Sequence, residues 1–552
     1  MKTSLLQILS AVSLAVMGCG SMLAVKAKPG VVKYTQPDGS VIEIMLQGDE
    51  RRHYATNLKG DVLKANEKGF YEVVAANAGT RGAEVPLDAV EGRGEPKYRY
   101  SASAFPTTGE PHSLVILVEY PDHGFNVQNP LEYFEDFLNG DNFTRDGGTG
   151  SCRKFYIENS NGAFQPTFDV YGPVMLANKR SYYGSGDESN APQMVVEAVK
   201  ALDDEVDFSV YDHNGDGFVD SVYIIYSDKG EADGGPRDTV WPFSWELLED
   251  DIVLKADGVQ FNTYGCSNEL QSDGDMEGIG TFTHEFGHVL GLPDLYNTYN
   301  SRDYTTPLDW SIMDNASYNN DSRTPCNFSS FERYSLGWLV PQEIVSSADY
   351  TLETLPESNK AYLMTTDSNP DEFYIMEYRL PKGWDEYLPT GGFLVWHVEF
   401  KQKAWDDNTV NNNPTHQYVE LVRADNMANT LTLTGDPFPG SFNIIEFSTD
   451  TKPALKSWAG DELRVTSLSN FRQHTDGTGS FTATCRATED NGIDMVEGEN
   501  NFSVEGNIVS VTSGRVAVAN LAGCTVGEAS PSNPLRLPPG IFIISGKKII
   551  VK

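Results

Sequence analysis

The chain has 552 residues, enough for two to four domains that each bury a core of their own. It carries 79 acidic against 41 basic side chains, a formal net charge of −38, and the sequence contains no basic cluster. This balance argues against a nucleic-acid-binding protein and suits an exported one, although most of these carboxylates need do no more than keep the surface hydrated.

The first 27 residues have the pattern of a signal peptide. Lys2 supplies a short positive region, and residues 5–17 are mostly apolar but too few to span a bilayer. Val25-Lys26-Ala27 offers a cleavage site after Ala27, while Val16-Met17-Gly18-Cys19 offers a lipoprotein-like alternative in which Cys19 anchors the chain. We expect an exported protein, extracellular or on the surface of a bacterium, with no transmembrane anchor.

Residues 28–107 are expected to form a small β-rich unit. Residues 31–35 and 41–46 have strand-like sequences, and Pro37-Asp38-Gly39-Ser40 between them is a good turn. This unit contains none of the six cysteines of the chain. The five cysteines beyond the signal peptide are too widely spaced for a metal-binding pattern. In an exported protein a disulfide such as Cys266–Cys326 is possible, but the sequence does not fix the pairing.

Between about residues 108 and 347 the sequence alternates between strand and helix patterns. Residues 113–120 and 219–226 are apolar runs typical of buried strands. Residues 130–138, 151–158 and 191–203 are predicted helices because their apolar residues recur at helical spacing. Such alternation predicts an α/β unit in which helices pack on a sheet.

A calcium-binding pattern lies just before the second of these strands. The first, third, fifth and ninth ligand positions of an EF-hand loop are occupied by Asp212, Asn214, Asp216 and Asp220. The twelfth position is Tyr223, so the closing bidentate glutamate is missing. The pattern predicts a bound calcium ion, with a polar turn that needs no ion as the alternative.

The most informative stretch is His-Glu-x-x-His at residues 284–288. His284 and His288 are four residues apart, so a helix from about 279 to 290 places both imidazoles on one face, where they can bind one metal ion. Glu285 can then take a proton from a metal-bound water. A buried helix with two structural histidines is the alternative, but it explains neither Glu285 nor the residues that follow.

A third ligand is expected soon after this helix. Gly291 can adopt left-handed dihedral angles and Pro293 cannot continue a helix, so the chain can turn back and present Asp294. Two imidazoles, one carboxylate and one open position are the ligands of a catalytic zinc site. The rival third ligand is Glu332, on a helix predicted at 329–336 that would have to dock against the first.

Asp309-Trp310-Ser311-Ile312-Met313-Asp314 resembles the methionine turn beneath the metal of metzincin proteases, with Met313 as its methionine. With residues 284–296 and 331–338, this turn makes the chain resemble the immune inhibitor A family of secreted bacterial metalloproteases, over about residues 30–480. The resemblance implies a zinc endopeptidase made as a precursor. Many relatives have Asp-Glu after the Leu-Pro pair, whereas here Asp294 precedes Leu295, so a rival carboxylate is missing.

The resemblance also implies roles for neighbouring segments. Residues 28–107 become a propeptide, with an accessory domain as the alternative. Because they lack cysteine, a cysteine switch is excluded, and a carboxylate such as Asp49 could serve instead. Residues 241–245 and 258–264 precede the zinc helix, where zincins commonly place an edge strand that pairs with the substrate backbone. Tyr318, just after the methionine turn, is a candidate to stabilise the oxyanion.

Beyond residue 347 the pattern becomes all-β. Short strands with many turns predict an antiparallel β-sandwich over 348–490, in which His397 and His416 are structural or surface residues. Residues 498–552 are expected to form a small C-terminal β domain. Its ending resembles the sorting domains of the type IX secretion route, whose machinery is then a partner; a plain β-sheet end domain is the alternative.

The sequence therefore predicts an α+β multidomain protein with a zincin-type catalytic domain at 108–347, in which a mixed sheet carries the zinc helix. The expected activity is that of a secreted, zinc-dependent endopeptidase, made as a zymogen, which hydrolyses peptide bonds of extracellular or host proteins. Glu285 is the general base for a zinc-bound water. Two other classes stay open: a catalytically weak surface protein that binds glycoproteins or glycans, and a zinc amidase acting on a cell-wall link.

Overall fold

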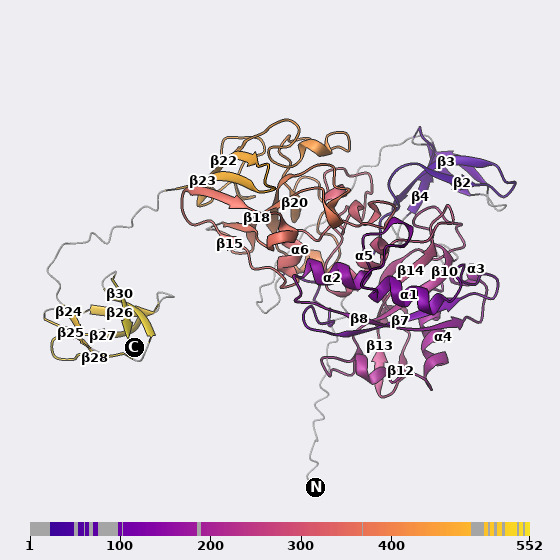
Figure 1. Ribbon diagram of the computed structural model, residues 1–552, viewed down its shortest axis with the longest axis horizontal. Coiled ribbons are helices and arrows are strands. Elements are labelled where there is room, and N and C mark those ends of the chain that lie inside the picture. Colours follow the sequence, from indigo (N-terminus) through magenta and orange to yellow (C-terminus); the bar gives the residue numbers. More distant parts are fainter. Residues whose placement is uncertain are drawn as a thin grey trace, which may run out of the picture. The chain divides into compact units, whose positions relative to one another are not determined.

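A computed structural model describes residues 23–48, 53–59, 61–65, 70–75, 98–101, 103–184, 189–366, 368–486, 502–505, 508–512, 516–520, 525–537, 540–544 and 547–551. The chain divides into two compact units, Met1–Cys485 and Arg486–Lys552. The first unit contains an N-terminal sheet, a mixed sheet with helices on both faces, and two further β-sheets (Figure 1). The structure is therefore α+β with several sheets, as the sequence predicts.

The N-terminal sheet is a meander in which each strand pairs antiparallel with the next. Its strands are β2 (Val32–Thr35), β3 (Val41–Gly48), β4 (His53–Thr56), β5 (Val62–Ala65) and β6 (Tyr71–Ala75). Its small core contains Val32, Ile44, Ala55 and Leu63. Strands are present where the sequence predicts them, whereas Asp49 lies outside the described residues.

The central sheet of the first unit is mixed. Its order is β1 (Leu23–Ala24), β11 (Phe243–Glu246), β14 (Thr263–Leu270), β10 (Val222–Lys229), β7 (His112–Glu119) and β8 (Thr167–Met175). The last four run parallel to one another, while β11 is antiparallel to β14 and β1 is antiparallel to β11. The two apolar runs predicted as strands correspond to β7 and β10.

Side chains of the central strands alternate between two cores, as the pleat of a strand requires. On β7, Val115 and Leu117 face a core shared with α1 (Pro130–Asn139), α2 (Cys152–Asn159) and α5 (Ile279–Val289). Leu114 and Ile116 face the opposite core, which α4 (Pro192–Leu202) covers. The short helix α3 (Arg180–Tyr183) and a small sheet of β12 (Leu254–Ala256), β13 (Val259–Phe261) and β9 (Phe218–Val219) complete this part.

Two sheets follow the central one and enclose a core that contains Tyr374, Phe393, Leu468 and Phe481. The first consists of β15 (Gln342–Glu343), β17 (Tyr362–Thr365), β18 (Glu372–Arg379), β19 (Gly392–Glu399) and β20 (Val419–Leu421). The second consists of β16 (Ala348–Leu352), β23 (Gly479–Cys485), β22 (Val465–Gln473) and β21 (Glu446–Ser448). Pairing is antiparallel except between β15 and β17, which departs from the purely antiparallel expectation.

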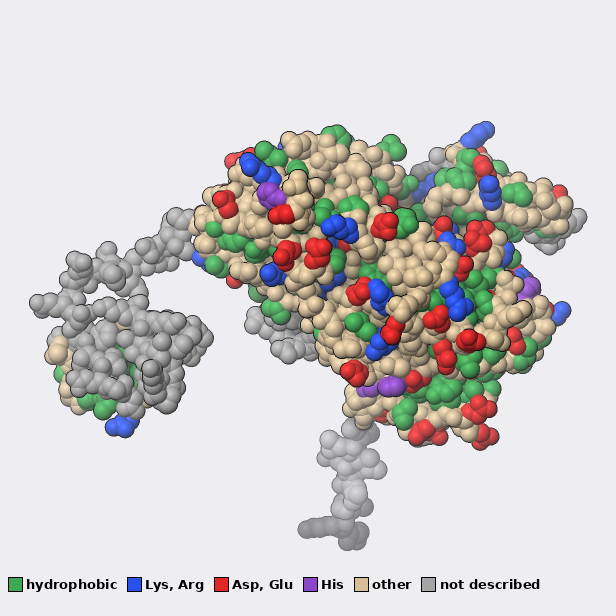
Figure 2. Space-filling view, in the orientation of Figure 1, with side chains coloured by type: hydrophobic (Ala, Val, Ile, Leu, Met, Phe, Trp, Pro, Cys, Tyr) green, Lys and Arg blue, Asp and Glu red, His purple; other side chains and the backbone are tan. Residues whose placement is uncertain are grey.

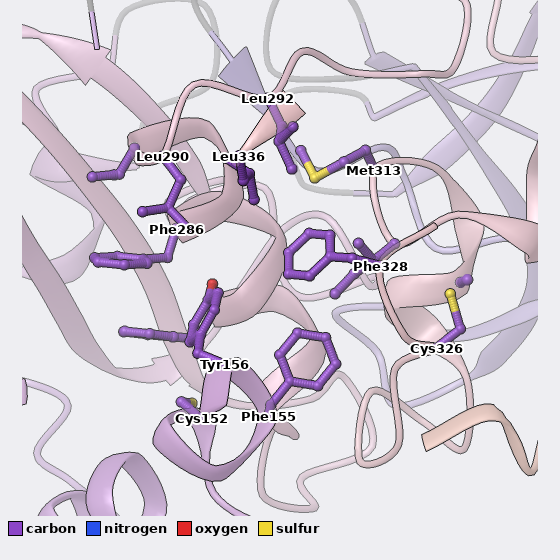
Figure 3. Close-up of a cluster of buried hydrophobic side chains, with 14 of the residues drawn as sticks. Cys152, Phe155, Tyr156, Phe286, Leu290, Leu292, Met313, Cys326, Phe328 and Leu336 are labelled. Carbon is purple, nitrogen blue, oxygen red and sulfur yellow. The ribbon is translucent and has the colours of Figure 1, made fainter. Parts of the chain in front are cut away.

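The core beneath α5 continues into these later sheets. It combines Phe155 and Phe286 of the central part with Trp396 of β19 and Trp405 of α8 (Gln402–Asp406). Helix α6 (Ser330–Ser335) lies in the chain that leads to these sheets, and α7 (Leu355–Ser358) lies between β16 and β17. Figure 3 shows part of this core. One hydrophobic core thus extends across the segments 108–347 and 348–490, which the sequence suggests as separate domains, while each segment also has a core of its own.

The C-terminal unit is a separate small β structure. One sheet contains β24 (Phe502–Glu505), β25 (Ile508–Val511) and β28 (Leu535–Arg536), and the other contains β27 (Thr525–Ala529), β26 (Val516–Asn520), β29 (Gly540–Ile544) and β30 (Lys547–Val551). Val509, Val518 and Ile544 are buried in its core.

Three further observations bear on the sequence predictions. Cys152, Cys266, Cys326 and Cys485 are free thiols, so the Cys266–Cys326 disulfide is absent. Within the described ranges, the structure contains no helix with the length and apolar character needed to cross a membrane. Acidic side chains on the face shown in Figure 2 are interspersed with lysine and arginine rather than gathered into one patch.

Candidate active site

Helix α5 carries the His-Glu-x-x-His motif and ends as the sequence predicts. Gly291 has a φ of +101°, in the left-handed region. The Leu292 N–H donates to the Gly287 carbonyl at 3.0 Å, and the Gly291 N–H donates to the His288 carbonyl at 2.8 Å. These two bonds close the helix and reverse the chain in the Schellman pattern. The reversal brings the residues after Gly291 back alongside the last turn of α5.

The reversal places one carboxylate oxygen beside both imidazoles. Asp294 Oδ1 lies 3.2 Å from His284 Nε2 and 3.3 Å from His288 Nε2, and the two Nε2 atoms are 3.2 Å apart. Zinc bonds of about 2.0–2.1 Å in a tetrahedral site put ligand atoms about 3.3 Å apart. All three side chains are buried, and among the described residues this is the one cluster of His, Cys, Asp or Glu that could hold a metal. The donor set fits zinc.

The polar atoms of these three side chains that point away from the cluster all form hydrogen bonds with other protein groups. His284 Nδ1 donates to the Ile312 carbonyl at 2.7 Å, and His288 Nδ1 donates to the Leu292 carbonyl at 2.8 Å. With the proton fixed on Nδ1, each Nε2 keeps a free lone pair that points at the other donor atoms. These hydrogen bonds therefore orient both imidazoles for a shared metal ion.

Asp294 is held by a residue far along the chain. Asn408 donates from Nδ2 to Asp294 Oδ2 at 2.6 Å and accepts the Asp294 N–H at 2.9 Å. Burial acts to raise the pKa of Asp294, but His288 and His284 outweigh it and hold the pKa below its ordinary value. The carboxyl group is therefore kept ionised, as a metal ligand must be.

Met313 packs against the last turn of α5. Its sulfur is so close to Gly287 that a Cβ at position 287 would lie 2.9 Å from it, which explains a glycine between the two histidines. The Met313 N–H donates to Ser311 Oγ at 3.0 Å, and the Met313 carbonyl accepts the Leu295 N–H at 2.8 Å. Figure 3 shows Met313 beside Leu292 and Phe328 in the core below the site.

Glu285 faces the edge of the central sheet, where a second segment of chain meets it. Its Oε1 accepts a hydrogen bond from the Val25 N–H at 2.7 Å. The residues before Val25 form β1, which pairs antiparallel with β11, so that Ala24 lies opposite Phe243. Without β1, β11 would be the edge strand of this sheet.

The comparisons with known proteins agree with this arrangement. Residues 110–339 match the model of the family described as immune inhibitor A peptidase M6, catalytic domain. These residues, here called the M6 domain, are similar to that family. The matched region contains α5, Asp294 and Met313. The M6 family consists of zinc endopeptidases.

Two curated relatives also match this chain, and the match to the second covers a larger share of it than residues 110–339. Immune inhibitor A of Bacillus thuringiensis subsp. alesti is 26% identical over 264 residues, which are 39% of this chain and 38% of the relative. Pre-pro-metalloprotease PrtV of Vibrio cholerae serotype O1 is 24% identical over 488 residues, 71% of this chain and 51% of the relative. The chain thus covers about half or less of the relatives it matches.

Glu332 and Tyr318, two other residues that the sequence predicts for the site, make different contacts. Glu332 does not join the metal cluster. Its carboxylate accepts one hydrogen bond from the Ser311 hydroxyl at 2.6 Å and another from the Ser329 N–H at 2.5 Å. The second bond is part of a capping box at the start of α6. Tyr318 donates its hydroxyl to the Lys26 carbonyl at 2.7 Å. It therefore contacts the docked segment, and its role at the oxyanion stays a prediction.

The predicted calcium loop folds into a tight turn. Both carboxylate oxygens of Asp212 accept backbone N–H groups of the loop, from Gly215, Asp216 and Gly217. Asn214 donates to Asp216 Oδ2, and Asp220 is buried with its Oδ2 2.8 Å from His213 Nδ1. The three aspartates Asp212, Asp216 and Asp220 do not form a metal cluster within the described part of the chain, and calcium stays a prediction.

Sequence reasoning missed the residues that come from distant segments. Asn408 and the Ile312 carbonyl hold metal-site side chains, and Trp241 donates its Nε1–H to the Val25 carbonyl at 2.9 Å. No local pattern marks Asn408, because it lies in an irregular turn 114 positions after the residue it binds. Of the two predicted edge segments, 241–245 contains most of β11, whereas 258–264 leads into the internal strand β14.

Proposed function

We propose that this protein is an exported zinc-dependent endopeptidase, with a zincin-type catalytic domain. The observation that supports this most strongly is the convergence of His284 Nε2, His288 Nε2 and Asp294 Oδ1 at 3.2–3.3 Å beside Glu285. These three side chains would hold the zinc, as the M6 family implies. When bound there, zinc supplies a Lewis acid that polarises a carbonyl and makes a bound water acidic.

Glu285 is the general base and then the general acid of the proposed reaction. It accepts a proton from the attacking water and passes it to the amine that leaves. The contact between Glu285 Oε1 and the Val25 N–H supports the second step, since it places a peptide nitrogen within 2.7 Å of the carboxylate. Glu285 is itself buried, which strengthens its interaction with a polar group in the site.

Strand β11 would position the substrate. An edge strand offers unpaired N–H and C=O groups, so an extended peptide can add to the sheet as a further strand. The pairing of β1 with β11 is an example of this geometry within the chain itself. Pairing through the backbone does not discriminate between substrate side chains, so their selection depends on pockets around the cleft.

The same contacts support synthesis as a zymogen. While residues 23–28 lie against Glu285 and β11, no substrate can take that place. The N-terminal sheet helps to hold this segment, because the Gly48 carbonyl accepts the Ala27 N–H at 2.9 Å. Signal cleavage after Ala27 would remove the residues that touch Glu285, whereas cleavage at Cys19 would keep them. Protein starting at residue 20 should then be much less active than protein starting near residue 111, and equal rates would contradict latency.

Export rests on the signal-like start, which lies mostly outside the described residues. The V. cholerae relative carries the words pre-pro in its name, which agrees with a signal and a propeptide in that protein. Sorting by type IX machinery through the C-terminal unit and a lipid anchor at Cys19 are finer proposals. Mass spectrometry of the N-terminus of the secreted protein distinguishes cleavage after Ala27 from cleavage at Cys19.

Peptide hydrolysis is tested directly with the purified protein and a diverse peptide mixture, read by mass spectrometry. We expect new peptide termini that disappear when a chelator removes the metal and return when zinc is added. A parallel incubation with casein and with peptidoglycan separates a peptidase from a cell-wall amidase. Absence of chelator-sensitive cleavage, in protein whose N-terminal segment has been removed, would refute the proposal.

A further inference from the structure

The side chain of Lys26 occupies a pocket beside the proposed active site. Its Nζ lies 3.4 Å from Asp314 Oδ1, and the exposed fractions of the two side chains are 7% and 0%. The same Nζ lies 5.7 Å from the centre of the Tyr296 ring, over its face. A lysine is therefore held by a buried carboxylate and an aromatic face, the two groups that recognise a cation most directly.

The pocket is part of the M6 domain and does not depend on the segment that fills it. Asp314 Oδ2 accepts the Leu308 N–H at 2.8 Å, so this oxygen is already used within the methionine turn. Oδ1 remains directed at Lys26. Tyr296 follows Asp294 in the same reversal of the chain. The pocket would thus stay in place, with its negative charge, once another peptide replaced the segment.

The register of the segment identifies the position that this pocket reads. In the proposed mechanism Glu285 protonates the nitrogen that leaves, and the nitrogen in contact with Glu285 Oε1 is that of Val25. The bond between Ala24 and Val25 then corresponds to the bond that is cut. Val25 takes the place of the first residue after the cut, and Lys26 takes the place of the second, the P2′ residue.

Lys28, two residues further along the segment, also lies among acidic side chains. Lys28 Nζ lies 3.4 Å from both Gln271 Oε1 and Asp321 Oδ1. The buried carboxyl groups of Asp233 and Glu277 also face Lys28. Burial raises the pKa of each, and the positive charge of Lys28 acts in the opposite direction. Lys26 is nevertheless more fully enclosed than Lys28, whose partner Asp321 is 60% exposed.

We propose that the Asp314–Tyr296 pocket is a specificity site that selects a basic residue, above all lysine, at P2′ of the substrate. This inference rests on the proposed function and names its substrate class: extended peptides with lysine two residues after the cut. A neutral side chain of equal length would leave Asp314 buried without a cationic partner, which is costly because the carboxylate has already lost its water.

The test uses five-residue peptides, Leu-Ala-Val-X-Ala, in which X is lysine, arginine, norleucine or glutamate. Binding is measured to the chain that begins at Lys28, carrying Glu285→Gln so that no peptide is consumed. We expect the lysine peptide to bind about tenfold or more tightly than the norleucine peptide, and the glutamate peptide to bind most weakly. The ratio of the first two affinities is compared within each protein, so a change in the folded fraction cancels.

Variants connect this ratio to the pocket. Asp314→Asn keeps an acceptor for the Leu308 N–H but removes the charge, and should bring the lysine-to-norleucine ratio close to one. Tyr296→Leu should lower it less. Asp275→Asn removes a carboxylate that is paired with Arg323 and 70% exposed, and should leave the ratio unchanged.

Equal binding of the lysine and norleucine peptides, or a ratio that survives Asp314→Asn, would overturn the inference. The same peptides are then offered to the chain without Glu285→Gln, and kcat/KM is measured for each. A preference for lysine in binding together with no cleavage of any peptide would refute the proposed function while leaving the pocket established. Cleavage without a preference for lysine at X would refute the lysine pocket and support the proposed function.

Discussion

The zinc motif and the calcium-like loop of the M6 domain begin as similar patterns of polar residues and end as different arrangements. At His284, His288 and Asp294, three donor atoms converge at 3.2–3.3 Å, and other protein groups hold their outward-facing atoms. At Asp212 both carboxylate oxygens accept N–H groups of their own loop. Spacing therefore identifies residues that can meet, while a prepared metal site also needs lone pairs left free to face one another.

The largest effect is expected from Asp294→Ala. Loss of the only carboxylate among the three donors leaves two histidines, so both bound zinc and peptidase activity should disappear. Glu332→Gln is the matched comparison, because glutamine can keep the capping box of α6 and should retain stoichiometric zinc. Elemental analysis of the two purified variants decides between them. Zinc retained by Asp294→Ala and lost by Glu332→Gln would reverse the assignment of the third ligand.

The next effect separates metal binding from proton transfer. Glu285→Ala should keep its zinc but lose about 10²–10⁴-fold in kcat, the usual contribution of a general acid–base group. Zinc content and kcat are measured on the same preparation. A variant that lost zinc as well would make Glu285 part of the metal site rather than the proton carrier.

A smaller effect is expected where the metal site is held from a distance. Asn408→Ala removes both hydrogen bonds to Asp294 and should weaken zinc affinity about 10–100-fold, as for other groups that orient a ligand. Asn412→Ala is the control: this residue binds Thr298 in the same pair of loops without touching a ligand. Competition with a chelator of known affinity measures both. Equal affinities in the two variants would show that Asn408 has no special role.

The smallest effect is expected at the calcium-like loop. If calcium binds the Asp212 loop only in the folded state, it adds about 2.7 kcal/mol to the free energy of unfolding at 100 times its Kd. Calcium-stripped protein should then melt at a higher temperature when calcium returns, and Asp216→Ala should remove this response. An unchanged melting temperature in the parent chain would leave a turn that needs no ion.

Much of the fold follows from local patterns. The helix predicted at 279–290 is α5 (Ile279–Val289), and the strand predicted at 113–120 is β7 (His112–Glu119). The second buried strand begins later than predicted, at Val222, because residues 220 and 221 separate it from β9. A local apolar pattern cannot detect such a break, since Val219 on the far side is also buried.

The residues of the site also fall into two groups, those that local patterns predict and those that they do not. The two histidines, Asp294 and the end of α5 at Gly291 could be predicted because a helix and a glycine turn are local structures. The contacts of Asn408 and Val25 could not, because each depends on how separate segments pack. The lysine pocket belongs to this second group: Asp314 lies in a motif recognised for its methionine, and only the packed structure brings Lys26 to it.

The link between Asp294 and Asn408 also has a practical consequence for anyone who divides this chain. The family match ends at residue 339, and a fragment cut there would lose Asn408 together with Trp396 and Trp405. It would also lose Arg423, which donates to the Thr305 carbonyl at 2.8 Å. Such a fragment should expose a large apolar surface and aggregate on expression, whereas a cut near residue 486, at the boundary between the two compact units, should leave a soluble protein with its metal site whole.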